Sequence, residues 1–143
     1  MKPYEIVDHT ADVRLKVNGA TLKELFQNAA FGMFAVISGN GQSGSIKYGV
    51  TKAIYIKREV EALEELLVDW LSELLYIFSK EKIFFKSFEV SELNNSGIKG
   101  EAHGDNITSG TRAAQTEIKA VTFHGLKIQE TARGFSCNII FDI

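Results

Sequence analysis

The sequence predicts an α+β fold, built as a single two-layer domain in which a mostly antiparallel sheet carries two amphipathic helices packed on one face. Two observations lead to this prediction. Residues 21–37 and 59–80 repeat apolar side chains at helical spacing, whereas much of the remaining chain reads as strands. Most strand-like segments follow the second helix, and this grouping is typical of α+β folds rather than of alternating α/β folds.

Two strands are predicted before the first helix. Residues 4–7 are a short strand candidate, and residues 13–17 alternate apolar and polar side chains, so that one side faces a core. By the same alternation, Asp12 falls on the polar side of its strand. Asn18 and Gly19 then give a turn signal.

The first helix is predicted at residues 21–37. Thr21, with Glu24 three residues later, forms a capping box, in which the two side chains satisfy backbone N–H groups at a helix start. Residues 50–57 follow as a strand. The glycine-rich residues 38–49 between them lack the Gly-Lys-Ser/Thr of a phosphate-binding loop, so a surface loop is the preferred interpretation.

The second helix is predicted at residues 59–80. Glutamates crowd its first turns, and Lys80 and Lys82 lie at its end, as the helix dipole favours. Its apolar stripe consists of Leu63, Leu66, Leu67, Trp70, Leu71, Leu74 and Phe78. The segments after it are read as strands at residues 83–90, 98–102, 115–123, 126–130 and 135–143, with a polar loop at 104–110.

The bulk properties restrict the function classes. The 143 residues fit one domain, residues 1–143. The net charge of −2 does not favour binding to a phosphate backbone, so strong direct nucleic-acid binding is not expected. The single cysteine, Cys137, has no disulfide partner and no zinc-site spacing, which favours a reducing, cytoplasmic setting. Neither a signal peptide nor an apolar run of the roughly 20 residues needed for a membrane helix is expected from the sequence.

Carboxylates at the two ends of the chain suggest a metal site. Asp12 opens one predicted strand, and Asp142 precedes Ile143, whose α-carboxylate is ionised at neutral pH. If the last strand is paired in the sheet to its final residue, Asp142 and Ile143 present two anionic groups close together. With Asp12 beside them, the natural occupant is a hard divalent cation with oxygen ligands, Ca²⁺ or Mg²⁺. Zinc is disfavoured without clustered His or Cys ligands.

Several blocks of the sequence jointly resemble the archease family. These blocks are HTADVRLKVNGATLKELFQNAAFGMF, LLVDWLSELLYIF, TEIKAVTFHGLKI and the terminal FDI, which run in order from His9 to Ile143. The HTAD opening, the EIKAVTFH block and the Asp-Ile terminus are specific in combination. Each alone would be a weak signal.

The resemblance implies a non-catalytic α+β protein that activates RtcB, the RNA-splicing ligase. Archeases promote guanylylation of that ligase and so permit multiple turnover in tRNA splicing and RNA repair; a chaperone-like role has also been suggested for the family. A metal ion, taken to be calcium, is held in the family by the Asp of HTAD and the terminal Asp-Ile. Carried onto this sequence, these ligands are Asp12, Asp142 and Ile143.

The sequence departs from the family pattern after Gly100-Glu101. Archeases often carry there an Asp followed by a His, whereas in this chain His103 precedes Asp105 and the next histidine is His124. Two other functions stay open at this point. One is a metal-dependent hydrolase that uses the same carboxylates, and the other is a chaperone-like module that modulates RNA- or DNA-processing proteins.

Overall fold

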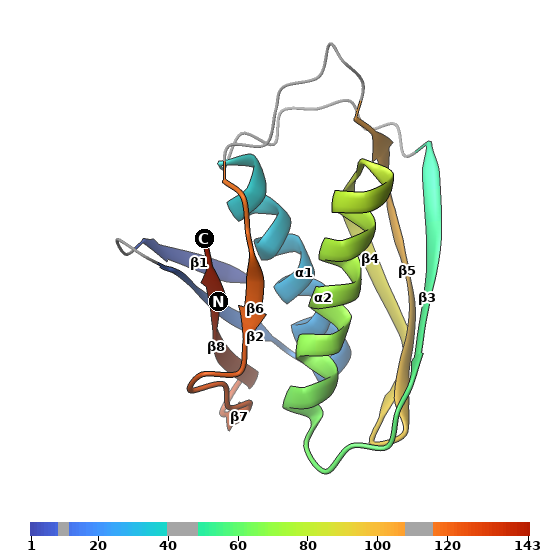
Figure 1. Ribbon diagram of the computed structural model, residues 1–143. Coiled ribbons are helices and arrows are strands. Elements are labelled where there is room, and N and C mark those ends of the chain that lie inside the picture. Colours follow the sequence, from blue (N-terminus) through green and yellow to red (C-terminus); the bar gives the residue numbers. More distant parts are fainter. Residues whose placement is uncertain (9–11, 40–48, 108–115) are drawn as a thin grey trace.

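Two antiparallel sheets enclose the two helices in the computed structural model, so the elements form three layers (Figure 1). The structure describes residues 1–8, 12–39, 49–107 and 116–143. The elements are β1 (Tyr4–Asp8), β2 (Asp12–Gly19), α1 (Leu22–Ser38), β3 (Val50–Lys57), α2 (Leu63–Glu81), β4 (Ile83–Asn94), β5 (Gly97–Asn106), β6 (Ala120–Thr122), β7 (Gln129–Thr131) and β8 (Gly134–Asp142).

The larger sheet has five strands and the smaller has three. In the larger sheet the order is β1-β2-β8-β6, with β7 paired to the other end of β8, and in the smaller the order is β3-β5-β4. All of these strand pairs are antiparallel. The larger sheet therefore joins the beginning of the chain to its end, because β2 and β8 are neighbours.

The α+β class, the two helices and the antiparallel pairing are confirmed, but the expected layering is wrong in one respect. The strands form two sheets, and the helices are covered on both sides rather than packed on one face of a single sheet. The reason is the width of the apolar surface of α1, which contacts β2 of one sheet and β4 of the other. A helix that is apolar on most of its circumference must be covered on more than one side. Its buried residues are Leu25, Phe26, Ala29, Ala30, Gly32, Met33, Phe34, Ala35, Val36 and Ile37.

Both ends of α1 are capped as the local sequence dictates. The Thr21 side chain accepts a hydrogen bond from the Glu24 backbone N–H at 3.1 Å, which satisfies one of the donors left free at the helix start. Gly39 ends the helix in the left-handed conformation, with φ of 68°. No helix in the described part of the chain is long and apolar enough to cross a membrane.

Helix α2 anchors the core through Trp70. Its indole ring is fully buried, and Nε1 donates a hydrogen bond to the Phe26 carbonyl of α1 at 3.1 Å. The ring also lies against Gly100 of β5, where an added Cβ would come within 3.2 Å of it. Trp70 therefore contacts both helices and the smaller sheet.

Strand β5 is longer than the sequence predicts. The segment expected to leave the sheet after Ala102 stays paired to Asn106, so Asp105 lies in a strand rather than in the loop predicted at residues 104–110. His103 lies in the same strand. Gly104 allows this, because a Cβ there would lie 2.0 Å from the Phe84 carbonyl oxygen of the neighbouring strand. A glycine read as a loop signal marks instead a close approach of two backbones.

Candidate metal centre

Asp12 and Asp142 are brought together by the register of the two central strands. Asp12 begins β2, Asp142 ends β8, and the two residues are direct cross-strand partners. The next pair along, Val13 and Phe141, is buried in the core. A one-residue slip would turn these apolar side chains to solvent, so burial of this pair holds the two aspartates opposite each other.

No positively charged side chain among the described residues balances the Asp12–Asp142 pair. Side chains directly opposite in an antiparallel pair lie on the same face, and like charges in that position repel. Asp12 lies on the polar side of its strand, as predicted, yet its Oδ1 atom is buried and finds no hydrogen-bond partner among the described residues. Within the same residues no ion pair involves either aspartate. A buried carboxylate oxygen without a donor is costly, and a cation would remove both penalties.

The end of β8 is held on its other side as well. The Lys119 N–H donates to the Asp142 carbonyl at 2.7 Å, and Ala120 of β6 is the cross-strand partner of Asp142. Ile143 is partly buried and packs against the core. Terminal residues usually fray unless they are tied down, and in this chain backbone pairing on two sides and apolar contact tie them down.

The three residues predicted from the sequence are therefore neighbours in the fold. The structure places Asp12 opposite Asp142, with Ile143 next along the chain. The rest of the HTAD motif, residues 9–11, and most of the glycine-rich segment, residues 40–48, lie outside the described residues. The donor set is two carboxylates, one of which has a buried oxygen that no described residue contacts as a donor, and such a set suits a hard divalent cation. That a metal binds at this position stays a prediction.

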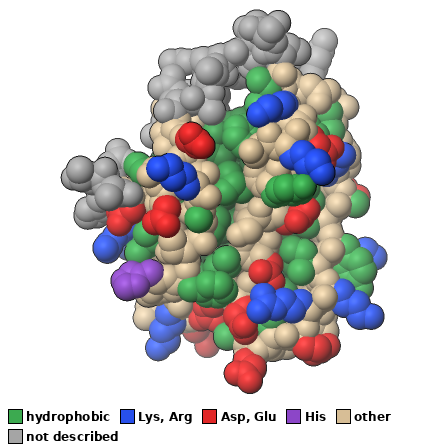
Figure 2. Space-filling view, viewed as in Figure 1, with side chains coloured by type: hydrophobic (Ala, Val, Ile, Leu, Met, Phe, Trp, Pro, Cys, Tyr) green, Lys and Arg blue, Asp and Glu red, His purple; other side chains and the backbone are tan. Residues whose placement is uncertain are grey.

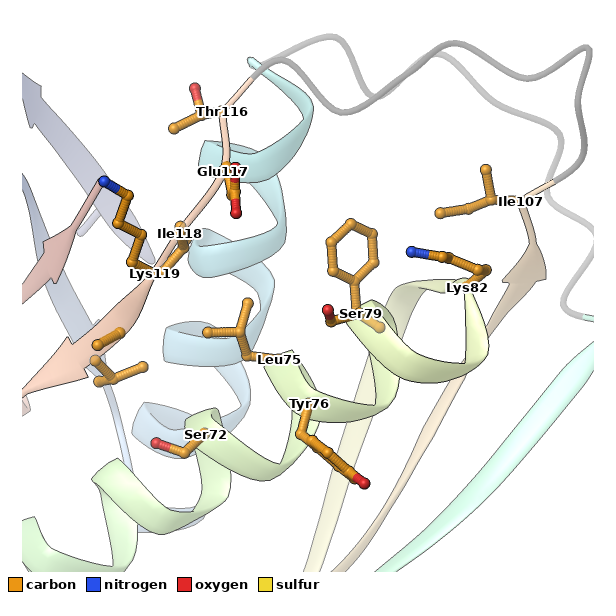
Figure 3. A pocket seen from close by; sticks show the side chains of 13 residues that line it. Ser72, Leu75, Tyr76, Ser79, Lys82, Ile107, Thr116, Glu117, Ile118 and Lys119 are labelled. Carbon is orange, nitrogen blue, oxygen red and sulfur yellow. The ribbon is translucent and has the colours of Figure 1, made fainter.

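A groove of about 850 Å³ lies between α2 and residues 116–121 (Figure 3). Figure 2 shows hydrophobic side chains along the middle of this face, with charged side chains on either side. Lys119 and Ala120, which contact Asp142 through the backbone, also line the groove. The groove therefore adjoins the backbone at the end of β8. The apolar lining comes mainly from Leu75, Phe78, Ile118 and Val121.

The single cysteine is not suited to nucleophilic chemistry. Cys137 lies on β8 and is buried. Burial, with a smaller contribution from the negative charge of Glu64, raises the pKa of its thiol to about 12. The thiol is therefore protonated at neutral pH, and a protonated thiol is a poor nucleophile.

A second set of metal-ligand side chains was not found from the sequence. Glu89, Glu101 and His103 offer ligand atoms that all lie within 4.8 Å of one another, on the smaller sheet. The signal that could have found them is the i, i+2 spacing of Glu101 and His103, which puts both side chains on one face of a strand. A strand that ends at Ala102, as the sequence predicts, leaves His103 outside that pattern.

The fold and the site define a small α+β protein with a pair of carboxylates at one end of its larger sheet. The profile of the Archease protein family matches residues 4–143. Protein archease of Methanosarcina acetivorans is 40% identical over 146 residues, which cover 99% of this chain and 97% of the relative. Protein archease of Archaeoglobus fulgidus is 32% identical and covers 98% of each chain. The chain belongs to the Archease protein family.

Solved structures agree with this assignment. The solution structure of protein 1598 of Methanobacterium thermoautotrophicum has a TM-score of 0.82 at 34% identity and covers all of both chains. A crystal structure described as an archease and possible chaperone, from Thermotoga maritima, has a TM-score of 0.64 at 21% identity and covers 96% of this chain and 94% of that one. The second similarity extends to the fold alone.

Proposed function

We propose that this protein is a non-catalytic accessory protein that activates an RtcB-type RNA ligase in the cytoplasm by promoting guanylylation and multiple turnover. Membership of the Archease protein family supports this proposal, because that is the activity the family resemblance implies. The observation that carries it is the Asp12–Asp142 pair, in which the buried Oδ1 atom of Asp12 has no hydrogen-bond partner in the described part of the chain. Two opposed carboxylates repel each other, and a bound cation would relieve that repulsion.

The ligands of the proposed cation are the side chains of Asp12 and Asp142 and the main-chain carboxylate of Ile143. Ca²⁺ is the expected ion and Mg²⁺ the alternative, since both prefer carboxylate and carbonyl oxygens. When bound, a divalent cation supplies positive charge that can neutralise a triphosphate during transfer of a nucleotidyl group. The contribution of the chain itself is to hold the oxygens in a fixed array, which the β2–β8 register and the backbone contact to Lys119 provide.

The test is multiple-turnover guanylylation and RNA joining by a purified RtcB-type ligase, with the protein added in substoichiometric amounts. The informative variant is Asp12→Asn, which keeps the side-chain shape and removes the charge. The matched control is Glu130→Gln, because Glu130 is an exposed glutamate on β7, at the opposite end of β8. We expect wild type and Glu130→Gln to accelerate the ligase equally and Asp12→Asn to lose most of the acceleration.

A ligase unaffected by the wild-type protein would contradict the proposal. So would equal activation by Asp12→Asn in a preparation whose circular dichroism matches wild type. Metal-dependent hydrolysis by the isolated protein would instead support a hydrolase that uses the same carboxylates.

The second candidate is a chaperone-like protein, which the description of the Thermotoga maritima relative as a possible chaperone favours. A partner could then bind in the groove between α2 and residues 116–121. This function predicts that the protein suppresses aggregation of the ligase during heating and that Asp12→Asn suppresses it equally. Dependence on Asp12 separates the two functions.

A further inference from the structure

The outer face of the smaller sheet carries a set of side chains that neither the family resemblance nor the proposed function uses. Glu89 lies on β4, and Glu101 and His103 lie on β5. Residues of β5 that alternate with them, Gly100 and Ala102, are buried against the helices. The three side chains therefore point away from the core.

The strand register brings these three side chains together. Glu89 and Glu101 are direct cross-strand partners, and His103 is two residues beyond Glu101 on the same face. One ligand atom from each residue lies within 4.8 Å of the other two. Three ligand atoms at that separation can reach a single ion with small side-chain adjustments, because metal–ligand distances are about 2.0–2.2 Å for zinc with nitrogen or oxygen.

The imidazole ring of His103 is oriented as a metal ligand requires. The Thr51 hydroxyl on β3 hydrogen-bonds Nδ1 at 2.9 Å, and Nε2 faces the Glu101 carboxylate at 3.6 Å. Histidines that bind metals usually have one ring nitrogen fixed by such a second partner, which leaves the other nitrogen for the metal. This fixed imidazole distinguishes the set from a group of surface acids.

The lysines that flank the set on the same strands interact with other residues. Lys86 of β4 pairs with Asp105 at 3.1 Å, and Lys99 of β5 lies over the Tyr55 ring at 5.9 Å from its centroid. Among the described residues, Glu89 forms no ion pair. The negative charge of the Glu89–Glu101 pair is therefore not balanced by a neighbouring lysine.

We propose that Glu89, Glu101 and His103 bind a divalent first-row transition-metal ion, with Zn²⁺ the best match. An imidazole selects such ions over Ca²⁺ and Mg²⁺, and two carboxylates with one imidazole leave a coordination position open to water. The ion would link β4 to β5 on the surface opposite the helices. This site is separate from the Asp12–Asp142 pair and does not depend on the proposed ligase function.

The test is Zn²⁺ binding by the full chain, measured by calorimetry and by amide chemical shifts. We expect Zn²⁺ to perturb amides around residues 89, 101 and 103, and His103→Gln to weaken that binding roughly tenfold or more. Thr51→Val removes only the hydroxyl that holds the ring, and a loss of about tenfold is expected. The matched control is His124→Gln, which changes an exposed histidine outside the smaller sheet.

Two results would overturn the proposal. One is Zn²⁺ binding by His103→Gln with wild-type affinity. The other is a set of Zn²⁺-induced shifts in the wild-type protein that spares β4 and β5. Because the second measurement uses the wild-type chain, it holds even if a variant folds poorly.

Discussion

Each sheet of the molecule contains a pair of carboxylates directly opposite each other, and the two pairs have different surroundings. The Asp12–Asp142 pair lies at the end of the larger sheet, beside the tied-down end of β8, with one oxygen buried. The Glu89–Glu101 pair lies on the outer face of the smaller sheet, where both side chains are exposed and His103 is adjacent. In both sheets two carboxylates are cross-strand partners, but the aspartate pair is partly buried and the glutamate pair is exposed.

Burial determines how much the repulsion between two opposed carboxylates costs. Exposed glutamates have long side chains that can move apart into water, so their repulsion costs little. Asp12 has a shorter side chain and one buried oxygen, so it is less able to move its charge away from Asp142. Ligand type then sets the ion: oxygens alone favour Ca²⁺ or Mg²⁺, and the imidazole favours a transition metal.

The largest effect is expected where the two sheets share a core. Trp70→Ala removes a fully buried ring that contacts both helices and β5, so it should destabilise the protein by about 3–5 kcal/mol. Urea unfolding measures the loss, and Tyr76→Ala, which truncates a side chain on α2 that is 54% exposed, is the control. Hydrogen exchange would show whether amide protection is lost in both sheets. If Trp70→Ala reduced protection in one sheet only, the two sheets that carry the carboxylate pairs would not unfold as one cooperative unit.

The reactivity of the Cys137 thiol reports on opening of the larger sheet alone, because Cys137 lies on β8. Burial raises the pKa of Cys137 on β8 to about 12 from 9.0, so the native thiolate fraction near pH 8 should be about a thousandfold below that of the unfolded chain. Because the unfolded thiol ionises first, this group lowers stability as pH rises from about 9 towards 12.

Alkylation at pH 8 with and without denaturant measures this protection. Ca²⁺ should slow the native reaction further if it holds β2 and β8 together, whereas Zn²⁺ on the smaller sheet should not. Rapid native labelling would show that the larger sheet opens readily.

The Asp12–Asp142 pair should reverse its effect on stability when a cation is added. Without metal, Asp12→Asn removes repulsion and should raise the free energy of unfolding by up to about 1 kcal/mol. At a Ca²⁺ concentration of about 100 Kd, wild type should gain about 2.7 kcal/mol and the variant should gain almost none. Chemical unfolding of both proteins, in chelator and in Ca²⁺, measures whether Asp12→Asn raises the free energy of unfolding without metal and lowers it relative to wild type with metal.

The smallest effect is expected at the exposed pair. Glu89→Gln in chelator should raise the free energy of unfolding by only a few tenths of a kcal/mol, because water screens both carboxylates. A gain equal to that of Asp12→Asn, measured side by side in urea, would show that burial does not distinguish the two pairs.

The local elements were largely predictable from the sequence, whereas their arrangement in layers was not. Thr21 caps α1 and Val13, Leu15 and Val17 face the core, as the capping and alternation rules state. The division into two sheets depends on which strands pair, and strand pairing is a long-range choice that periodicity does not record.

The candidate metal centre was suggested by residue types and the family resemblance, but the register that joins Asp12 to Asp142 comes from the structure. The Glu89, Glu101 and His103 set was missed for a different reason. Glycine is a common loop residue, so Gly104 predicts a loop, whereas its missing side chain is what lets β5 pass close to Phe84.

Calorimetric titration with Ca²⁺ is the most direct test of whether Asp12 and Asp142 together hold a divalent cation. Wild type, Asp12→Asn, Asp142→Asn and the Glu130→Gln control would be titrated under identical low-salt conditions. We expect one bound Ca²⁺ in wild type and in Glu130→Gln, and affinity at least roughly tenfold weaker in each aspartate variant. Equal affinity in all four proteins, or no binding by wild type, would contradict it.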